Sequence, residues 1–368
     1  MLNKIIIVQH QFSLTTAKTQ RMLAAAKVYK QSGLEVVFVI STDDKNILID
    51  DIVSRYIIIN ETRFNKLSCF INFTRSIKSE YTKDSVILFD GVPLYSFLFK
   101  SFKYSVFAEI TEVPFYGLTP SFFARILESI RFRAIKHFSG IQVISPSLKS
   151  YYFERGIQNI EVVNMFVDDS RFDNLTKKVE GRYITYCGTL SLYKDGVDDL
   201  IKSFGIFSKS NPEYILQLIG DFQSEAVKET LYSLVDELGL TNKIIFKGRV
   251  CSKEMPQLLV DSDILVLARP DNAQAQYGFP TKLGEYLATG NPVVVTSVGD
   301  IPLFLKNKEN ALLAAPNDPE SFASQLEWII MNKQEAALIA LRGKELIKSV
   351  FSSEVQIGKA LSFYMGIH

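Results

Sequence analysis

Short apolar runs alternate with amphipathic segments of helix length along the whole chain, and this order restricts the possible fold more than any other feature. The runs form two series, at 5–9, 35–40, 85–90, 105–110 and 140–145, and again at 182–188, 214–220, 243–248, 263–268 and 292–296. Strands that are apolar almost throughout are typical of sheets buried on both faces, because a repeated strand–helix order covers a parallel sheet with helices. The sequence therefore predicts an α/β protein with two Rossmann-like parallel-sheet domains.

The length of 368 residues also favours two domains over one. A polar segment at 168–181 is typical of the links between domains. We therefore predict an amino-terminal domain over residues 1–172, a carboxyl-terminal domain over 173–350 and a last helix over 351–368. Ligands of open parallel sheets bind outside the carboxyl ends of the strands, so a site is expected in the loops that follow the strands.

The composition argues against several classes of function. A formal net charge of +1 gives no sign of a nucleic-acid binder, and no G-x-G-x-x-G motif follows a strand, which argues against a nicotinamide-dependent dehydrogenase. No apolar run approaches the ~20 residues of a membrane span, and the first residues enter a strand too soon for a signal peptide. Cys69, Cys187 and Cys251 lie far apart without metal-ligand spacing, so we expect reduced thiols in a cytoplasmic protein.

The stretch YGFPTKLGEYLATG follows a predicted strand and has the features of an anion-binding helix start. Pro280 and Thr281 suit the first helical positions, whose backbone N–H groups lack partners within the helix. An anion at such a helix end gains about 0.3–1 kcal/mol, and Lys282 adds a positive charge. One turn later, Glu285 can accept hydrogen bonds from ribose hydroxyls. A capped helix with a solvated glutamate explains the same pattern, so the stretch alone leaves both interpretations open.

A second candidate phosphate site follows the strand at 182–188. Gly188 leaves room for a phosphate close to the backbone, and Lys194 opens the next helix. A lysine about 4 Å from a phosphate charge contributes a Coulomb energy of about 4 kcal/mol at an effective dielectric constant of about 20. A helix-start lysine in water is also common. The occurrence of two such sites after two strands favours the phosphate role.

The pattern P-T-K-x-x-E-Y-x-x-x-G-x-P-V-V resembles the donor-site signature of the family 4 (group 1) retaining glycosyltransferases, which have the GT-B fold. The runs YCGTLSLYKDGVDDLI, IGDF, FKGRV and DSDILVLARP occur in the order and spacing of that family. The resemblance covers most of the chain and is most specific in the carboxyl half. It implies two domains facing a cleft, a carboxyl-terminal helix that crosses back to the first domain, and hexose transfer from a nucleotide diphosphate sugar.

The resemblance also implies where the donor binds. The pyrophosphate would lie between the loop at 188–194 and the helix start at 281–283, and Glu285 would hold the ribose. The backbone near Arg249 and Val250 would meet the base. The predicted donor-binding residues are Gly188, Thr189, Lys194, Arg249, Val250, Arg269, Tyr277, Gly278, Phe279, Pro280, Thr281, Lys282, Leu283 and Glu285.

Three of these residues are also the predicted catalytic ones. Lys194 and Lys282, with the helix dipole, would stabilise the charge that develops on the leaving diphosphate, and Glu285 would hold the ribose. Two positions depart from the family pattern: Tyr277 stands where a sugar-contacting glutamate is usual, and Thr189 stands where an arginine is common. We hypothesise that Lys282 replaces the missing arginine. The sugar contacts would then come from Gln274, Gln276, Arg269 or Tyr277.

Fewer signals mark the first domain, where the resemblance places the acceptor. His10 and Thr16 lie just after the first strand, and Glu109 and Glu112 lie at the end of the strand at 105–110. We predict that these four residues contact a saccharide or lipid-linked acceptor. Both glutamates also fit surface carboxylates beside a turn, and a lone histidine is more often structural.

The segment 122–138 interleaves aromatic residues with the cations Arg125, Arg131, Arg133 and Lys136. A basic amphipathic helix of this kind can lie on an anionic membrane surface. A stripe that packs into the core, with a solvated basic face, explains the same pattern. A position at the inner face of the cell membrane would suit an enzyme with a lipid-linked acceptor.

The sequence identifies the donor only as a UDP- or GDP-linked sugar, and we predict neither a metal nor another cofactor. The run DSD at 261–263 resembles a metal-binding D-x-D motif, but it stands directly before a buried strand. The predicted function lies in the synthesis of a surface polysaccharide or glycoconjugate. Two alternatives stay open: a GT-B epimerase that cleaves a nucleotide sugar without an acceptor, and a non-catalytic nucleotide-sugar-binding partner.

Overall fold

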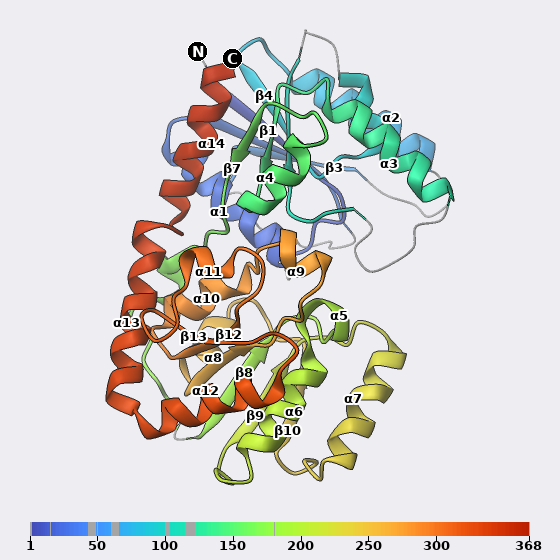
Figure 1. The fold of residues 1–368 in the computed structure, drawn as a ribbon. Coiled ribbons are helices and arrows are strands. Elements are labelled where there is room, and N and C mark those ends of the chain that lie inside the picture. Colours follow the sequence, from blue (N-terminus) through green and yellow to red (C-terminus); the bar gives the residue numbers. More distant parts are fainter. Residues whose placement is uncertain are drawn as a thin grey trace. The chain divides into compact units, whose positions relative to one another are not determined.

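The computed structural model of the protein describes residues 2–14, 16–42, 49, 51–59, 66–99, 104–114, 122–179 and 181–367. The chain forms two compact units, and Figure 1 shows the course of the chain through each. Unit 1 comprises residues 1–166 together with 353–368, and unit 2 comprises residues 167–352. The carboxyl-terminal helix α14 (Ser353–Ile367) therefore belongs to unit 1, as the predicted fold requires.

Unit 1 is built on a parallel sheet whose described strands number seven, in the order β3-β2-β1-β4-β5-β6-β7. They are β1 (Lys4–Gln9), β2 (Glu35–Ser41), β3 (Arg55–Ile59), β4 (Ser85–Asp90), β5 (Ser105–Ile110), β6 (Gly140–Val143) and β7 (Ile160–Val162). Each neighbouring pair is parallel, and β1, β2 and β4 are buried along nearly their whole length. The burial predicted from the apolar runs is confirmed.

Helices lie on both sides of this sheet, with α1 and α14 on one side and α2 and α3 on the other (Figure 1). The helices before α14 are α1 (Ala17–Gln31), α2 (Lys66–Glu80), the 3-10 helix η1 (Leu94–Phe99), α3 (Phe122–Ile135) and α4 (Pro146–Phe153). Thr16 caps α1, because its hydroxyl accepts a hydrogen bond from the N–H of Thr19 at 3.3 Å. Tyr364 of α14 lies in the core beside Tyr29 and donates a hydrogen bond to Gln142 at 2.6 Å. These contacts anchor the last helix to unit 1.

Unit 2 contains a second parallel sheet, with six strands among its described residues in the order β10-β9-β8-β11-β12-β13. They are β8 (Tyr183–Cys187), β9 (Ile215–Ile219), β10 (Ile244–Gly248), β11 (Ile264–Leu267), β12 (Val293–Thr296) and β13 (Leu312–Ala314). The helices are η2 (Asp169–Phe172), α5 (Leu192–Asp195), α6 (Val197–Phe207), α7 (Glu225–Glu237), α8 (Met255–Val260), α9 (Ala273–Tyr277), α10 (Lys282–Thr289), α11 (Ile301–Phe304), α12 (Pro319–Met331) and α13 (Lys333–Ser349). The strand order reverses between β8 and β11, and ligands of doubly wound sheets bind at the carboxyl ends of such a pair.

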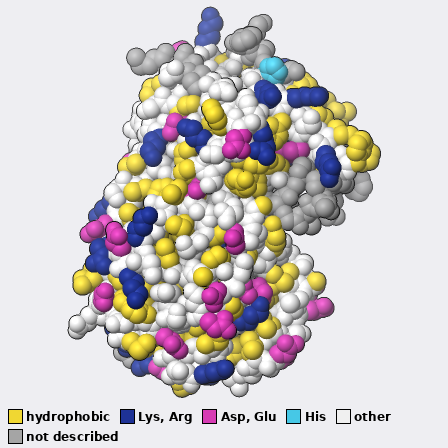
Figure 2. All heavy atoms as spheres, in the orientation of Figure 1, with side chains coloured by type: hydrophobic (Ala, Val, Ile, Leu, Met, Phe, Trp, Pro, Cys, Tyr) yellow, Lys and Arg dark blue, Asp and Glu magenta, His cyan; other side chains and the backbone are white. Residues whose placement is uncertain are grey.

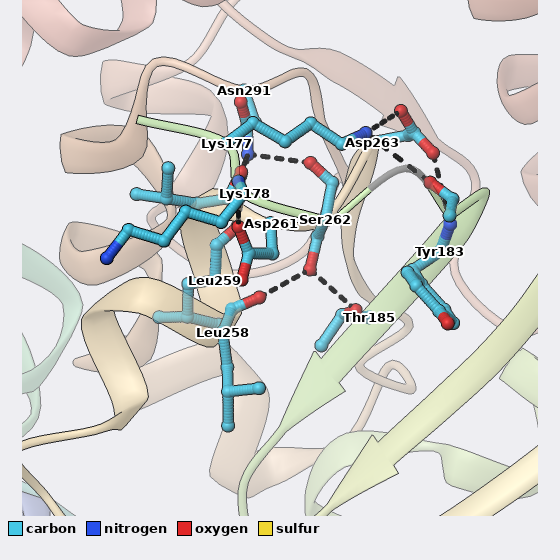
Figure 3. Close-up of polar contacts among 12 residues, drawn as sticks. Lys177, Lys178, Tyr183, Thr185, Leu258, Leu259, Asp261, Ser262, Asp263 and Asn291 are labelled. Atoms are coloured by element: carbon cyan, nitrogen blue, oxygen red, sulfur yellow. Dashed lines mark hydrogen bonds and ion pairs between the residues drawn. The ribbon is translucent and has the colours of Figure 1, made fainter. Parts of the chain in front are cut away.

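The DSD run at 261–263 forms hydrogen bonds around the amino-terminal end of β11 (Figure 3). The carboxylates of Asp261 and Asp263 accept hydrogen bonds from the N–H of Lys178 at 2.7 Å, the N–H of Tyr183 at 3.0 Å and Nζ of Lys177 at 2.5 Å. Between them, the hydroxyl of Ser262 donates to Thr185 at 2.7 Å. These residues therefore hold the segment before β8 against β11.

Among the described residues, no helix has both the length and the apolar character needed to cross a bilayer. Within the same residues, no group of three or more His, Cys, Asp or Glu side chains is arranged to hold a metal ion.

Candidate functional site

The carboxyl ends of β8 and β9 meet through two glycines with positive φ angles. Gly188 follows β8 with a φ of 150°, and Gly220 follows β9 with a φ of 135°. A Cβ at Gly220 would lie 2.0 Å from the carbonyl oxygen of Gly188, and a Cβ at Gly188 would lie 2.2 Å from Nζ of Lys282. Only glycine fits both positions without strain. The backbone of Gly188 consequently lies directly against the ammonium group of Lys282.

Lys282 is the first residue of α10 and is held in a buried polar cluster. Its Nζ donates hydrogen bonds to Oδ2 of Asp195 at 2.7 Å and to the hydroxyl of Tyr186 at 3.0 Å. The Tyr186 hydroxyl in turn lies 2.8 Å from the same carboxylate oxygen. An ammonium group has three donors. Two of them are occupied by described residues, so the third is left for a ligand.

Burial and charge act in opposite directions on this cluster. Burial alone would raise the pKa of Asp195, but the charges of Lys282 and Arg269 hold it below its usual range. Burial lowers the pKa of Lys282, and the charge of Lys194 acts in the same direction, whereas Asp195 raises it. A buried ion pair of this kind is stable only while both partners are present.

Lys194 lies on the single turn of α5, which Ser191 caps. The N–H of Lys194 donates a hydrogen bond to the hydroxyl of Ser191 at 3.0 Å, and the lysine side chain is half-buried. The charge of this lysine contributes to the lowering of the pKa of Lys282. The structure brings Gly188 and Lys282 together, whereas a shared anion for the two lysines stays a prediction.

Glu285, one turn into α10, forms an ion pair that the sequence did not predict. Nη1 of Arg171, from η2, lies 2.5 Å from Oε1 of Glu285, and Nη2 of Arg171 donates to the carbonyl of Ser252 at 2.8 Å. Both side chains are 23 % exposed. Arg171 therefore fixes the orientation of Glu285 and occupies one of its two carboxylate oxygens.

Several predicted donor-binding residues have buried side chains. Phe279 packs against two further phenylalanines, and Pro280 and Leu283 are also buried. Arg269 is 3 % exposed and donates a hydrogen bond to the carbonyl of Gly278 at 3.4 Å. The side chains of these residues belong to the core of unit 2, and their contact with a donor stays a prediction.

The remaining predicted donor residues lie at or near the surface. Arg249 forms an ion pair with Asp221 at 2.6 Å, and both side chains are more than half exposed. Thr189 is exposed, whereas Tyr277, the last residue of α9, is half-buried, as is Val250. The N-cap of α10 is Thr281, whose side chain makes no capping hydrogen bond. Pro280 and Thr281 thus precede the helix, which begins one residue later than the sequence suggested.

Unit 1 contains a cavity of about 560 Å³ at the carboxyl ends of β1, β4 and β5. Its polar lining comes from His10, Asp90, Glu112, Glu128 and Arg131, and its apolar lining includes Ile110, Val113, Ile135 and Tyr152. Nε2 of His10 lies 2.7 Å from the hydroxyl of Tyr95. Two of the predicted acceptor residues, His10 and Glu112, therefore line one cavity at the ligand-binding edge of the sheet.

The two other predicted acceptor residues have different positions. Glu109 is 4 % exposed, and its Oε1 accepts hydrogen bonds from Nε of Arg21 at 2.9 Å and from Nε2 of Gln142 at 3.0 Å. Arg21 holds this carboxylate in the core, and the acceptor contact of Glu109 stays a prediction. Thr16 is exposed and caps α1. Neither residue is part of the cavity lining.

Asp90, the last residue of β4, is a cavity residue that the sequence analysis missed. Its side chain is 2 % exposed, and Nζ of Lys18 lies 2.9 Å from its Oδ2. Burial raises the pKa of Asp90 to about 6, although the charge of Lys18 opposes the shift. A carboxylate kept in such a position costs stability whenever it is ionised.

Replacing Asp90 by asparagine is expected to make the protein more stable above about pH 6. Between about pH 4 and pH 6 the folded protein holds a proton that the unfolded chain releases, so wild-type stability falls as the pH rises through this window. A shift of about two units corresponds to a loss of about 3 kcal/mol, which the variant avoids. Urea denaturation at about pH 4 and pH 8 measures the free energy of unfolding of both proteins, with Asp173→Asn on the surface as the control. Parallel pH profiles of wild type and Asp90→Asn would contradict it.

Comparison with known proteins gives matches in both sequence and structure. Residues 167–345 match the family model described as glycosyl transferases group 1. Mannosylfructose-phosphate synthase of Agrobacterium fabrum is 26 % identical over 210 residues, which cover 53 % of this chain and 45 % of that protein. A putative colanic acid biosynthesis glycosyltransferase of Escherichia coli is 24 % identical over 201 residues, which cover 54 % and 49 %. Each match thus spans less than half of the relative's length.

The whole chain is similar to solved structures of HepE from Anabaena. The complex of HepE with UDP and glucose has a TM-score of 0.78 at 16 % identity, over 98 % of this chain and 99 % of that one. A further HepE structure contains UDP-glucose. At this level of identity the similarity concerns the fold alone. With its two parallel-sheet α/β units, the protein has the GT-B fold.

Proposed function

We propose, from the match of residues 167–345 to the family model of group 1 glycosyl transferases, that the protein is a retaining glycosyltransferase of the hexosyltransferase type. It moves a sugar from a nucleotide diphosphate sugar to a saccharide or lipid-linked acceptor, in the synthesis of a surface polysaccharide or glycoconjugate. The observation that carries the proposal is the ammonium group of Lys282, held against Gly188 by Asp195. The match to a colanic acid glycosyltransferase supports the polysaccharide assignment.

We place the diphosphate of the donor at Gly188, between Lys194 and Lys282. A glycine lets a phosphate approach the backbone closely, and two lysines balance the charge of a diphosphate. Glu285 keeps one carboxylate oxygen for the ribose hydroxyls, because Arg171 occupies the other. The HepE complexes with UDP and with UDP-glucose support a UDP-linked donor. No metal is part of this proposal.

In the proposed reaction, the acceptor hydroxyl attacks the anomeric carbon from the face that the diphosphate leaves. The bond between the anomeric carbon and the diphosphate oxygen breaks, the new glycosidic bond forms, and a diphosphate oxygen takes the hydroxyl proton. Negative charge therefore accumulates on the diphosphate. Lys194 and Lys282 are positioned in advance to stabilise it, and such fixed charges need no reorganisation during the reaction.

For the acceptor we propose the cavity of unit 1. A volume of about 560 Å³ lies within the range of about 300–1,000 Å³ that is usual for small-molecule sites. The carboxylates of Asp90 and Glu112 accept hydrogen bonds from sugar hydroxyls, and His10 adds a group that either donates or accepts. Tyr152 provides an apolar surface for the face of a sugar ring.

The donor can be identified from thermal stability. A nucleotide sugar that binds only the folded protein stabilises it by about 2.7 kcal/mol at a concentration one hundred times its Kd. We therefore expect one UDP- or GDP-linked sugar of a panel to raise the melting temperature, with a smaller rise for the nucleotide diphosphate and none for the free sugar. Equal melting temperatures across the whole panel would contradict the proposed donor site.

Release of the nucleotide diphosphate from that donor then separates the three functions. Release that requires an acceptor extract supports the transferase, and the anomeric configuration of the product, measured by NMR, tests retention. Release without any acceptor identifies an epimerase. Binding without release identifies a non-catalytic binding partner.

A further inference from the structure

Helix α3 turns its apolar side away from unit 1. Phe122 and Phe123 are 74 % and 76 % exposed, and the exposed fractions of Ile126, Leu127 and Ile130 are 42 %, 39 % and 37 %. At the spacing of a helix these five residues form one stripe. A surface helix normally packs such a stripe against the core. This stripe therefore does not pack into the core, whereas Ala134, Ile135 and Phe138 at the end of the segment 122–138 do.

The opposite side of α3 faces into unit 1 and carries the polar residues Glu128 and Arg131 beside the apolar Phe132 and Ile135. Nη1 of Arg131 lies 3.2 Å from Oε2 of Glu128, and the Glu128 side chain is only 15 % exposed. Both residues line the cavity together with Ile135. The inward side of α3 therefore contacts unit 1, whereas the apolar stripe on its outward side is exposed.

The 3-10 helix η1 packs beside α3 and extends the apolar surface. Leu94, Phe97 and Leu98 of η1 are each 38–39 % exposed. Figure 2 shows hydrophobic side chains gathered over this part of unit 1, with Lys and Arg side chains beside them. We call the five α3 residues and these three η1 residues the apolar surface. A contiguous exposed surface of this kind, bordered by polar groups, marks an interaction site.

Three exposed cations border the apolar surface along α3 and the residue that follows its end. Arg125, Arg133 and Lys136 lie on the same edge of the stripe, next to Phe122, at about 100° per residue of helix. None of the three forms an ion pair with a carboxylate in the part of the chain that the structure describes. The acidic residue of α3, Glu128, is turned inward.

We propose that the apolar surface docks on an anionic lipid bilayer. The aromatic and aliphatic side chains of α3 and η1 enter the boundary between headgroups and acyl chains, and Arg125, Arg133 and Lys136 contact lipid phosphates. An apolar stripe with a cationic border is the composition of helices that lie in a membrane interface. A second copy of the chain is a poorer occupant, because a symmetric pairing through this surface would bring the same three cations toward one another. The proposal does not depend on the proposed enzymatic function.

Sedimentation with vesicles tests the docking directly. We expect the protein to bind vesicles that contain phosphatidylglycerol at least tenfold more strongly than vesicles of phosphatidylcholine alone, and to lose affinity as salt is added. The double substitution Phe122→Ser/Phe123→Ser is expected to lower the partition coefficient at least tenfold. Alanine at any one of the three cations is expected to lower it about fivefold.

The matched control is Leu338→Ser/Leu341→Ser on α13, two exposed leucines of unit 2 at 56 % and 54 %. All of these side chains are exposed, so melting temperatures close to that of the wild type verify that each variant is folded. Equal vesicle binding by the wild type and the double serine variant would overturn the proposal, as would failure of the wild type to bind anionic vesicles. Sedimentation velocity provides the remaining test: a dimer that the serine variant converts to a monomer would assign the apolar surface to a second copy instead.

Discussion

Replacing Lys282 by methionine is expected to lower the free energy of unfolding by about 3–5 kcal/mol and to weaken diphosphate binding about 10- to 150-fold. Methionine keeps much of the side chain's length but removes its charge. The carboxylate of Asp195, only 3 % exposed, then stays buried without the cation that lies 2.7 Å away in the wild type. An uncompensated buried charge is far more costly than the ion pair is favourable.

A second substitution separates the structural part of this effect from the binding part. The double variant Lys282→Met/Asp195→Leu replaces the buried ion pair by two apolar side chains, a change that is often neutral for stability. We therefore expect most of the lost stability to return. Diphosphate binding is expected to stay weak, since the ammonium group that contacts the ligand is absent.

Urea denaturation and calorimetric titration with UDP measure the two effects. The control is Lys202→Met on the surface of α6, where the lysine pairs with Asp198 and Asp199 of its own helix. Exposed pairs of this kind contribute about 0–1 kcal/mol. Wild-type affinity for UDP in the double variant would show that Lys282 has a structural role alone.

Ten of the thirteen described strands could be predicted from the sequence because the signal is local, whereas β3, β7 and β13, at the edges of the two sheets, were not predicted. A strand buried on both faces is apolar throughout, whatever its place in the sheet, so each apolar run identifies a strand without knowledge of its neighbours. The position of η2 in unit 2 has no such signal. Its Arg171 pairs with Glu285 and with the backbone of Ser252, residues far along the chain, and only the folded structure brings them together.

The residues of the candidate site also divide into those with a local sequence signal and those without one. The glycine and lysines at Gly188, Lys194 and Lys282 were predictable because each stands in a short motif at a strand or helix end. Asp195, the counter-ion of Lys282, is separated from it by 87 residues, and nothing local distinguishes it from a solvated helix residue. The ion pair of Glu109 likewise has no local signal: its position at a strand end favours a ligand contact, but its partner Arg21 lies 88 residues away in the sequence.

Helix α3 illustrates a limit of amphipathic patterns. Its sequence contains one apolar and one polar side, and the pattern alone does not state which of them faces the protein. The cavity of unit 1 determines the orientation of α3. Glu128 and Arg131 line the cavity, so Phe122 and Phe123 lie on the outward side. The orientation follows from tertiary structure that the helix sequence does not contain.

Replacing Lys194 by alanine is expected to lower kcat about 10²- to 10³-fold while leaving stability almost unchanged. Removing one group that stabilises developing charge costs about 2.7–4 kcal/mol in the transition state. The fold tolerates the change because the N–H of residue 194, and not its side chain, makes the hydrogen bond to Ser191 that begins α5.

The kinetic constants distinguish a transition-state role from simple donor binding. If the interaction strengthens as the diphosphate leaves, kcat and kcat/KM fall together and KM for the donor changes little. Lys194→Arg, which keeps the charge, is expected to retain more activity than the alanine variant, and Lys202→Ala is the control for loss of an exposed lysine. Initial rates of nucleotide release at several donor concentrations supply these constants. A raised KM with an unchanged kcat would instead mean that Lys194 binds donor and transition state equally, and the stabilisation of the leaving group would then fall to Lys282 alone.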